Sequence, residues 1–197
     1  MVQVIPTGRL VLRHWRDSDR RPFQALNADP RVMEFMPGLL SPQASDESIA
    51  RIEKHLDRHG FGLFAAELVE EKEFIGYIGL AIPSFDAPFM PAVEIGWRLA
   101  HEYWGRGLAT EGARAVVQHA FEALSLSSLV SFTVPRNLRS RRVMEKIGMV
   151  HDPKDDFEHP SLPAGHPLRS HVLYRIQTRP ASQGRQGAEG GKLWAGD

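Results

Sequence analysis

The chain has 197 residues, of which 42 % are hydrophobic and 24 % charged, and a formal net charge of +0 with its nine His counted as neutral. This length suits one domain with a sizeable core, and the balanced charge excludes a global field that would favour nucleic acid or an acidic membrane surface. The chain has no Cys, which excludes disulfides, thiolate metal sites and a cysteine nucleophile. No signal-like start and no apolar run of about 18 residues is present, so we expect a cytoplasmic protein. The oligomeric state is left open, a homodimer included.

The first half of the chain predicts strands and helices in short succession. In chain order these are a strand at 8–15, a helix from about 17 to 28, a helix at about 43–59, and two strands at 61–69 and 74–82. The strands rest on period-two alternation and the helices on apolar side chains at helical spacing. An irregular piece, RVMEFMPG, separates the two helices, and the polar stretch 70–73 suits a turn between the two strands.

The second half predicts a strand–helix–strand–helix unit and a closing strand. The predicted elements are a strand at 93–99, a helix at 110–124, a strand at 129–134, a helix at 138–147 and a strand at 171–177. Coming after antiparallel strands, this unit indicates an α+β fold with a mixed sheet in one domain over 1–178. From residue 179 onward Gly, Ala, Ser and Gln dominate, which predicts a flexible C-terminal tail at 179–197.

The segment WGRGLAT, from Trp104 to Thr110, is the most informative motif. Gly105 and Gly107 let the backbone turn tightly between a strand and a helix, so the free N–H groups at the helix start converge on a point that favours phosphate. A nucleotide-triphosphate loop would need a Gly-Lys step followed by Ser or Thr. A dinucleotide fingerprint would need a third glycine where Thr110 stands, and an acidic residue roughly 20 positions further on. The sequence meets neither requirement.

These residues resemble the acetyl-coenzyme A binding core of the GNAT N-acetyltransferases. Gly107, Leu108 and Ala109 match the end of that family's motif, whereas Trp104 stands where Gln or Arg is usual. YWGRGLATEG, the early GRLVLRHWRDSD and the late EKIGM resemble the branch of ribosomal-protein N-terminal acetyltransferases. The resemblance covers about residues 8–178 and implies a single-domain GNAT-like fold with a mostly antiparallel sheet. Within that sheet, two parallel strands, 93–99 and 129–134, would splay apart.

The resemblance also implies a coenzyme site between those strands. The pantetheine arm of acetyl-coenzyme A would bond the backbone of Leu99 and Ala100, with Asn137 as a further partner of its amides. Its pyrophosphate would bind the backbone amides of Trp104, Gly105, Arg106, Gly107, Leu108, Ala109 and Thr110. A nearby basic cluster comprises Arg136, Arg139, Arg141, Arg142 and Lys146. This cluster, Arg142 above all, is suited to the adenosine phosphate, or it is a solvated helix face.

Acetyl transfer from a thioester to an amine needs a neutral amine, a polarised carbonyl and a protonated leaving thiolate. It needs no enzyme nucleophile, so the absence of Cys is no obstacle. Neutralising an α-amine at pH 7 costs roughly 1 kcal/mol, against about 4.6 kcal/mol for a lysine amine. We therefore expect a weakly basic amine and a modest base. Glu94, on the polar face of the strand 93–99, is the expected base, unless it is an ordinary surface glutamate, and Glu67 is a weaker candidate.

The proton for the thiolate has a less obvious source. Many GNAT enzymes use a tyrosine on the last cleft helix, but this chain has no Tyr between Trp104 and Lys154. The resemblance places a catalytic serine at Ser140, one turn into that helix. The alternative is that Ser140 caps the helix together with Asn137, which is itself suited both to capping and to binding pantetheine.

A polar loop at 151–169 is rich in Pro and His. His159 and His166, with His171 beyond the loop, match no compact zinc motif, so we expect no metal site. The segment resembles a loop that lies over the acceptor cleft in one subgroup of GNAT enzymes, where its charges would contact the acceptor.

The sequence therefore predicts an acetyl-coenzyme A dependent N-acetyltransferase. It would act by direct transfer in a ternary complex on a primary amine, either a protein N-terminus or a small molecule. Two alternatives stay open: a module that binds acyl-coenzyme A without turnover, and a nucleotide-binding regulator.

Overall fold

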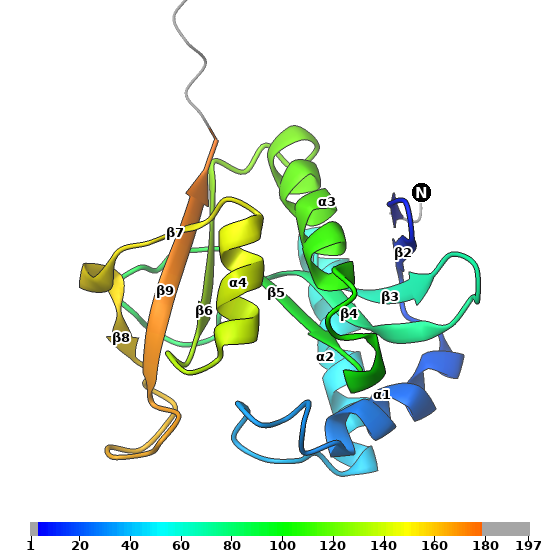
Figure 1. Ribbon diagram of the computed structural model, residues 1–197, viewed down its shortest axis with the longest axis horizontal. Helices are drawn as coiled ribbons and strands as arrows, with labels where there is room; N and C mark the ends of the chain where they lie inside the picture. The colour runs from blue at the N-terminus through cyan, green and yellow to red at the C-terminus, as the bar shows by residue number, and fades with distance from the viewer. Residues whose placement is uncertain (1–3, 179–197) are drawn as a thin grey trace, which may run out of the picture.

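The computed structural model describes residues 4–178, which form one sheet flanked by helices (Figure 1). The strands are β1 (Ile5–Pro6), β2 (Leu10–Arg13), β3 (Leu63–Leu68), β4 (Phe74–Ala81), β5 (Glu94–Leu99), β6 (Ser128–Thr133), β7 (Val150–His151), β8 (Phe157–Glu158) and β9 (Ser170–Gln177). The α-helices are α1 (Arg20–Ala28), α2 (Pro42–His59), α3 (Leu108–Glu122) and α4 (Leu138–Lys146). Single 3-10 turns lie at η1 (Asp17–Asp19), η2 (His101–Tyr103) and η3 (Pro153–Asp155). None of the helices in this part of the chain has the length and apolar character needed to cross a membrane.

The sheet runs in the order β1-β2-β3-β4-β5-β6-β9-β7, with β8 paired to β9. Every pair of neighbouring strands is antiparallel except β5 and β6, which are parallel and share the single register pair Glu94–Val130. Beyond that pair the two strands diverge, as Figure 1 shows. This confirms the predicted mixed, mostly antiparallel sheet with one splayed parallel pair.

The helices cover both faces of the sheet. On one face α3 packs so closely that a Cβ added to Gly112 would lie 2.4 Å from Cδ1 of Ile78, a residue of β4. On the other face Phe23 of α1 meets the ring of Tyr77 edge-on, with 6.1 Å between centroids. Since Ile78 and Tyr77 are consecutive strand residues, their side chains leave opposite faces, and the hydrophobic core therefore has two layers.

The observed boundaries differ from the predicted ones at the element ends. The helix α3 begins at Leu108, two residues before its predicted start, because Gly107 adopts the left-handed conformation at its N-terminal cap. The strands β1, β7 and β8 were not predicted, and each is two residues long and exists through pairing with a distant segment. The proposed tail at 179–197 lies outside the described residues.

Candidate active site

The predicted phosphate loop lies between β5 and α3. Gly105 and Gly107 have φ angles of 74° and 79°, which favour glycine. The first helical bond of α3 runs from the amide of Glu111 to the carbonyl of Gly107, and no side chain caps this end of the helix. The amides of Leu108, Ala109 and Thr110 therefore have no acceptor within the helix. They form a site suited to an anion.

Glu111 and Arg9 tie this loop to the edge of the sheet. The Glu111 carboxylate accepts bonds from the Arg9 backbone amide and the Thr7 hydroxyl, both at 2.7 Å, and pairs with the Arg9 guanidinium at 2.6 Å. Arg9 also donates from Nη1 to the carbonyl oxygen of Arg106 over 3.0 Å. Burial raises the Glu111 pKa, but the bonds from Thr7 and Arg9 outweigh it and leave the pKa lowered. The Arg9–Glu111 ion pair thus holds the loop in place at Arg106, between the two glycines.

A cavity of about 390 Å³ opens beside the loop and reaches the gap between β5 and α4. We call it the coenzyme cavity, after the ligand that the sequence predicts for it. Its lining includes most of the predicted coenzyme contacts, namely Leu99, Trp104, Gly105, Gly107, Leu108, Ala109, Thr110, Asn137 and Arg142. Its charged lining residues are all basic: Arg31, Arg98, Arg139, Arg142 and Lys146. Among the described residues that line it there is no Asp or Glu, so the cavity favours a polyanionic ligand. Ala100 and Arg106 are not part of this lining.

The members of the basic cluster on and before α4 separate into two groups. Arg142 and Lys146, one helical turn apart, line the cavity, and so does Arg139. Arg141 turns away, because its Nε donates to the Tyr174 hydroxyl over 3.1 Å and its Nη1 to the Pro135 carbonyl. Arg136 lies over the ring of Phe35.

The backbone of β5 presents hydrogen-bonding groups to the gap between the splayed strands. The Ala100 amide donates to Ile75 of β4, and the Val130 amide of β6 donates to Val93. Because bonding directions alternate along a strand, Trp97 and Leu99 direct their N–H and C=O groups toward β6 rather than β4. The Leu99 carbonyl is already bonded by the indole N–H of Trp104 at 2.8 Å. The Leu99 N–H and both groups of Trp97 are thus placed for the amides of a pantetheine arm.

Glu94 lies at the apex of the gap, where β5 and β6 share their one register pair. It is only partly exposed, and its Oε1 leans along β5, lying 3.8 Å from the position that a Cβ of Gly96 would take. Burial raises the pKa of Glu94 to about 8, without an ion pair to offset it among the described residues. Since α1 covers the face that carries Arg98, and Glu94 shares that face, the carboxyl is on the opposite face from α3.

Ser140 lies in the first turn of α4 and lines the coenzyme cavity. Its amide donates to Oδ1 of Asn137 over 3.2 Å, and its hydroxyl oxygen accepts from Nδ2 of the same residue over 3.1 Å. Nδ2 also donates to the Thr133 hydroxyl at 2.9 Å. Asn137 therefore caps the helix, as predicted, and because it donates to Ser140 Oγ, the Ser140 proton is available to another acceptor.

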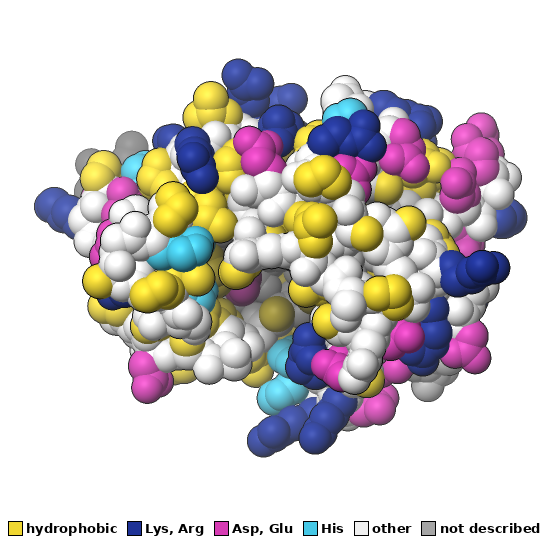
Figure 2. Space-filling model, turned by 90° about the horizontal axis from the view of Figure 1, so that it is seen from below, with side chains coloured by type: hydrophobic (Ala, Val, Ile, Leu, Met, Phe, Trp, Pro, Cys, Tyr) yellow, Lys and Arg dark blue, Asp and Glu magenta, His cyan; other side chains and the backbone are white. Residues whose placement is uncertain are grey.

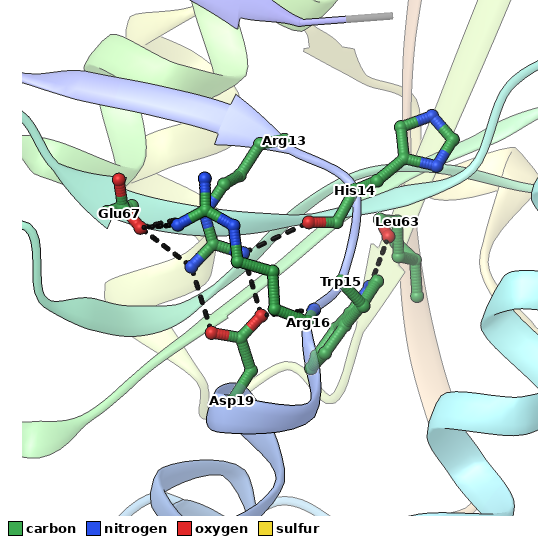
Figure 3. Close-up of polar contacts among 7 residues, drawn as sticks. All are labelled: Arg13, His14, Trp15, Arg16, Asp19, Leu63 and Glu67. Atoms are coloured by element: carbon green, nitrogen blue, oxygen red, sulfur yellow. Dashed lines mark hydrogen bonds and ion pairs between the residues drawn. The ribbon is translucent and has the colours of Figure 1, made fainter. Parts of the chain in front are cut away.

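Glu67, the weaker base candidate, is held in a separate ion-pair network (Figure 3). Its Oε2 lies 2.7 Å from Nη2 of Arg13 and 2.9 Å from Nη1 of Arg16. Arg13 also pairs with Asp19 at 2.7 Å, and the hydrogen bonds that Arg13 donates to the Asp19 carboxylate raise the Arg13 pKa despite burial. The network links β2, β3 and η1, and it engages the Glu67 carboxylate with two cations.

The histidine-rich segment packs as part of an aromatic cluster rather than converging on a metal. The cluster is formed by Phe85, Phe89, Phe132, Phe157, His159 and His171. The rings of His159 and His171 are 5.1 Å apart, and burial lowers the pKa of both, which leaves them neutral near pH 7. Within residues 4–178 no three His, Asp or Glu side chains form a group suited to a metal ion.

Sequence reasoning missed the contribution of the irregular segment 29–41 between α1 and α2. Its residues Arg31, Val32, Phe35 and Met36 line the coenzyme cavity. Glu34 bonds Arg139 of α4 at 2.6 Å, and the Arg139 guanidinium lies 4.5 Å from the Trp104 ring centroid. Several large apolar residues occur there without strand or helix periodicity, which indicates burial but not which part of the molecule the segment covers.

A second cavity, of about 600 Å³, lies between segment 29–41, α2 and the sheet. It is lined by Phe23, Met33, Met36, Pro37, Gly38, Leu39, Leu40, Ser48, Arg51, Ile52, His55, Leu63, Tyr77, Leu80, Ala81 and Arg98. Met36 and Arg98 also line the coenzyme cavity, so the two adjoin. Figure 2, which views the lower edge of the molecule in Figure 1, shows a hollow near the middle of that face. The acidic atoms visible inside the hollow do not belong to the residues that line this cavity.

Comparison with known proteins agrees with this geometry. Residues 9–150 match the acetyltransferase (GNAT) domain family. YkkB from Bacillus subtilis is 32 % identical over 144 residues, covering 73 % of this chain and 83 % of YkkB. A crystal structure of an acetyltransferase from Agrobacterium tumefaciens has a TM-score of 0.72 at 30 % identity, covering 90 % of this chain and 96 % of that one.

RimJ from Mycobacterium smegmatis, solved with a coenzyme A disulfide, shares the fold. Its TM-score is 0.68 at 22 % identity, covering 89 % of this chain and 85 % of RimJ. The predicted resemblance to ribosomal-protein acetyltransferases is thus confirmed at the level of the fold. The chain belongs to the GNAT acetyltransferase family and is an N-acetyltransferase that takes its acetyl group from acetyl-coenzyme A.

Proposed function

We propose that the enzyme transfers acetyl directly from acetyl-coenzyme A to a primary α-amine while both substrates are bound. The observation that carries the proposal is the junction of the two cavities at Met36 and Arg98, which gives each substrate its own entrance to one gap. The coenzyme enters beside the loop 104–110, and the acceptor enters from the face of Glu94. The chain has no cysteine to carry an acetyl group between them.

Glu94 is proposed as the base that removes a proton from the acceptor. A raised pKa of about 8 matches that of an α-amine, about 7.7–8.0, so proton transfer from ammonium to carboxylate is nearly balanced in free energy. For a lysine amine, with a pKa near 10.4, the same transfer costs roughly 3 kcal/mol. This difference favours a protein N-terminus or a similar small α-amine over a lysine side chain.

The thioester and its leaving group would be handled by the opposite wall of the gap. The backbone N–H of Trp97 or Leu99 is suited to bond the thioester carbonyl or the pantetheine amides. Ser140, whose hydroxyl oxygen already accepts from Asn137, is proposed to donate its proton to the departing thiolate. A water relays the second proton of the acceptor nitrogen to the Ser140 oxygen, which restores the hydroxyl, and the proton held by Glu94 leaves to solvent.

Release of free thiol from acetyl-coenzyme A tests the proposal across peptides, polyamines and aminoglycosides. We expect thiol release that requires an amine, is fastest with peptide α-amines, and shows intersecting initial-rate lines when both substrates are varied. Parallel lines would indicate an acetyl-enzyme and contradict direct transfer. Coenzyme binding without thiol release with any amine would instead indicate a binding module.

A further inference from the structure

The second cavity combines an apolar wall with basic groups only. Ten of its lining residues are large and apolar or aromatic: Phe23, Met33, Met36, Pro37, Leu39, Leu40, Ile52, Leu63, Tyr77 and Leu80. Its ionisable groups are Arg51, His55 and Arg98, and among the described residues that line it there is no Asp or Glu. Such a lining opposes polycationic acceptors, because their additional ammonium groups would lose hydration without gaining a counter-charge.

Arg98 is held in this cavity by neutral partners. Its Nη1 donates to Oδ1 of Asn27 over 2.7 Å, its Nη2 contacts the Met36 sulfur at 3.0 Å, and its guanidinium lies 5.5 Å from the Tyr77 ring centroid. Asn27 is fully buried and donates in turn to the Ser45 hydroxyl of α2. Partners from α1, segment 29–41 and β4 thus fix a partly buried guanidinium, and no carboxylate within residues 4–178 forms an ion pair with it.

The separation of Arg98 from Glu94 determines the length of an acceptor that contacts both side chains. Both side chains leave the same face of β5, with Gly96 between them. Arg98 is opposite Tyr77 of β4, and Glu94 is opposite Ala81. Four residues of strand span about 13 Å, and the Glu94 carboxyl leans toward Gly96, which shortens the separation. An acceptor that bridges the two groups therefore spans two to three residues of extended peptide, at about 3.3–3.6 Å per residue.

We propose that the acceptor is an apolar peptide-like α-amine that carries an anionic group two to three residues from its amine, and that Arg98 selects this anion. The amine lies at Glu94, the apolar side chains fill the cavity under segment 29–41, and the anion pairs with the Arg98 guanidinium. This inference rests on the proposed function. The anionic group is either the C-terminal carboxylate of a short peptide or an acidic side chain near a protein N-terminus.

Matched peptides test the inference by thiol release. One pair is the tripeptide Gly-Leu-Phe as free acid and as amide, and a second pair is a longer peptide amide with either Glu or Gln at its third position. We expect kcat/KM to be about tenfold to a hundredfold higher for the anionic member, in line with a charge-assisted hydrogen bond. A preference confined to the free acid indicates short peptides as acceptors, and one shared by the Glu peptide indicates protein N-termini.

Variants assign the preference to Arg98. Arg98→Gln is expected to bring the ratio of kcat/KM values for acid and amide close to one, and Arg98→Lys to keep part of it. Asn27→Asp supplies a carboxylate to Arg98 and is expected to abolish the preference by a second route. Arg58→Gln, an exposed arginine on the same helix as Arg51, is the matched control and should keep the full preference.

Any of four results would overturn the inference. Equal kcat/KM for the acid and the amide in the wild type, or faster turnover of polyamines or aminoglycosides, would refute it and leave the proposed direct transfer intact. A preference that survives unchanged in both folded Arg98→Gln and folded Asn27→Asp proteins would place the anion site elsewhere. Absence of thiol release with every amine would refute the proposed function, and this inference with it.

Discussion

The indole N–H of Trp104 donates to the carbonyl oxygen of Leu99 over 2.8 Å, and so joins the phosphate loop to the end of the splayed strand. The motif of the family usually has Gln or Arg at this position. Here the indole also lies under the guanidinium of Arg139, 4.5 Å from it, and Arg139 pairs with Glu34 of segment 29–41. Trp104 thereby connects three parts of the coenzyme cavity.

Trp104→Phe should weaken coenzyme binding more than catalysis. The variant keeps an aromatic face for Arg139 but leaves the Leu99 carbonyl without its donor, which corresponds to about 0.5–1.5 kcal/mol. We expect KM for acetyl-coenzyme A to rise about threefold to tenfold with kcat changed less, as measured by thiol release. A fall in kcat at unchanged KM would place Trp104 in the chemical step instead.

The Arg9–Glu111 pair should likewise act on coenzyme affinity. Glu111→Gln removes the charge that holds Arg9 against the Arg106 carbonyl, so we expect a several-fold increase in the coenzyme dissociation constant by calorimetry. Because the Glu111 pKa is lowered in the folded state, its contribution to stability is present near neutral pH and is lost as the solution is acidified through that pKa. Arg20→Gln, which breaks an exposed pair with Asp17, is the control and should bind coenzyme normally.

Glu94→Gln should lower the activity of the enzyme while raising its stability at high pH. The folded protein holds the Glu94 proton up to about pH 8, whereas an unfolded chain releases it near 4.5, so the folded state binds more protons between these values. The contribution of Glu94 to the free energy of unfolding therefore falls as the pH rises through this window. We expect Glu94→Gln to lower kcat about a hundredfold yet to raise Tm relative to wild type more at about pH 9 than at about pH 6. An equal change in Tm at both pH values would contradict the raised pKa.

The same carboxyl should shape the pH profile of the wild-type enzyme. At pH 7 most of it is protonated in the free enzyme, so kcat/KM should rise toward a plateau above about pH 8. Peptide amines of different pKa distinguish the ionisation of Glu94 from that of the acceptor. The part of the pH profile due to Glu94 stays at the same pH for every peptide, while the part due to the amine shifts with the pKa of the amine. If the whole profile follows the pKa of the amine, the base is water or another group.

Ser140→Ala should reduce turnover with little effect on coenzyme binding. The hydroxyl would no longer protonate the thiolate, and we expect kcat to fall about tenfold to a hundredfold. Asn137→Ala is the comparison, because it also removes the helix cap and should lower stability by about 1 kcal/mol. If Ser140→Ala retains full kcat with an acceptor that makes chemistry rate-limiting, Ser140 only helps to cap α4 and is not the proton donor.

Local patterns in the sequence were enough to predict most of the helices and strands. The alternation in 93–99, the apolar stripe of α3 and the Asn137 cap depend on neighbours in the chain, and the structure has each of them. What the sequence could not supply depends on distant pairing. The two-residue strand β8 exists because it pairs with β9, and the Glu34–Arg139 bond joins residues 105 positions apart.

In the candidate site, too, some features could be predicted from local sequence and others depend on packing between distant residues. The glycine-broken loop and Glu94 were identified from local sequence, but the engagement of Glu67 with two arginines and the neutral setting of Arg98 arise only from packing. Segment 29–41 lacked any periodic pattern, so its place over both cavities could not be predicted from the sequence.

A crystal structure with acetyl-coenzyme A bound is the decisive test of direct transfer in the gap between β5 and β6. We expect pyrophosphate oxygens within hydrogen-bond distance of the amides at 107–110, the pantetheine arm between β5 and β6 against Trp97 and Leu99, and the thioester sulfur near Ser140 Oγ. The acetyl carbon would then be open to attack from the face of Glu94. A thioester that lies outside the gap, or one that presents its acetyl carbon away from Glu94, would rule out direct transfer with Glu94 as the base.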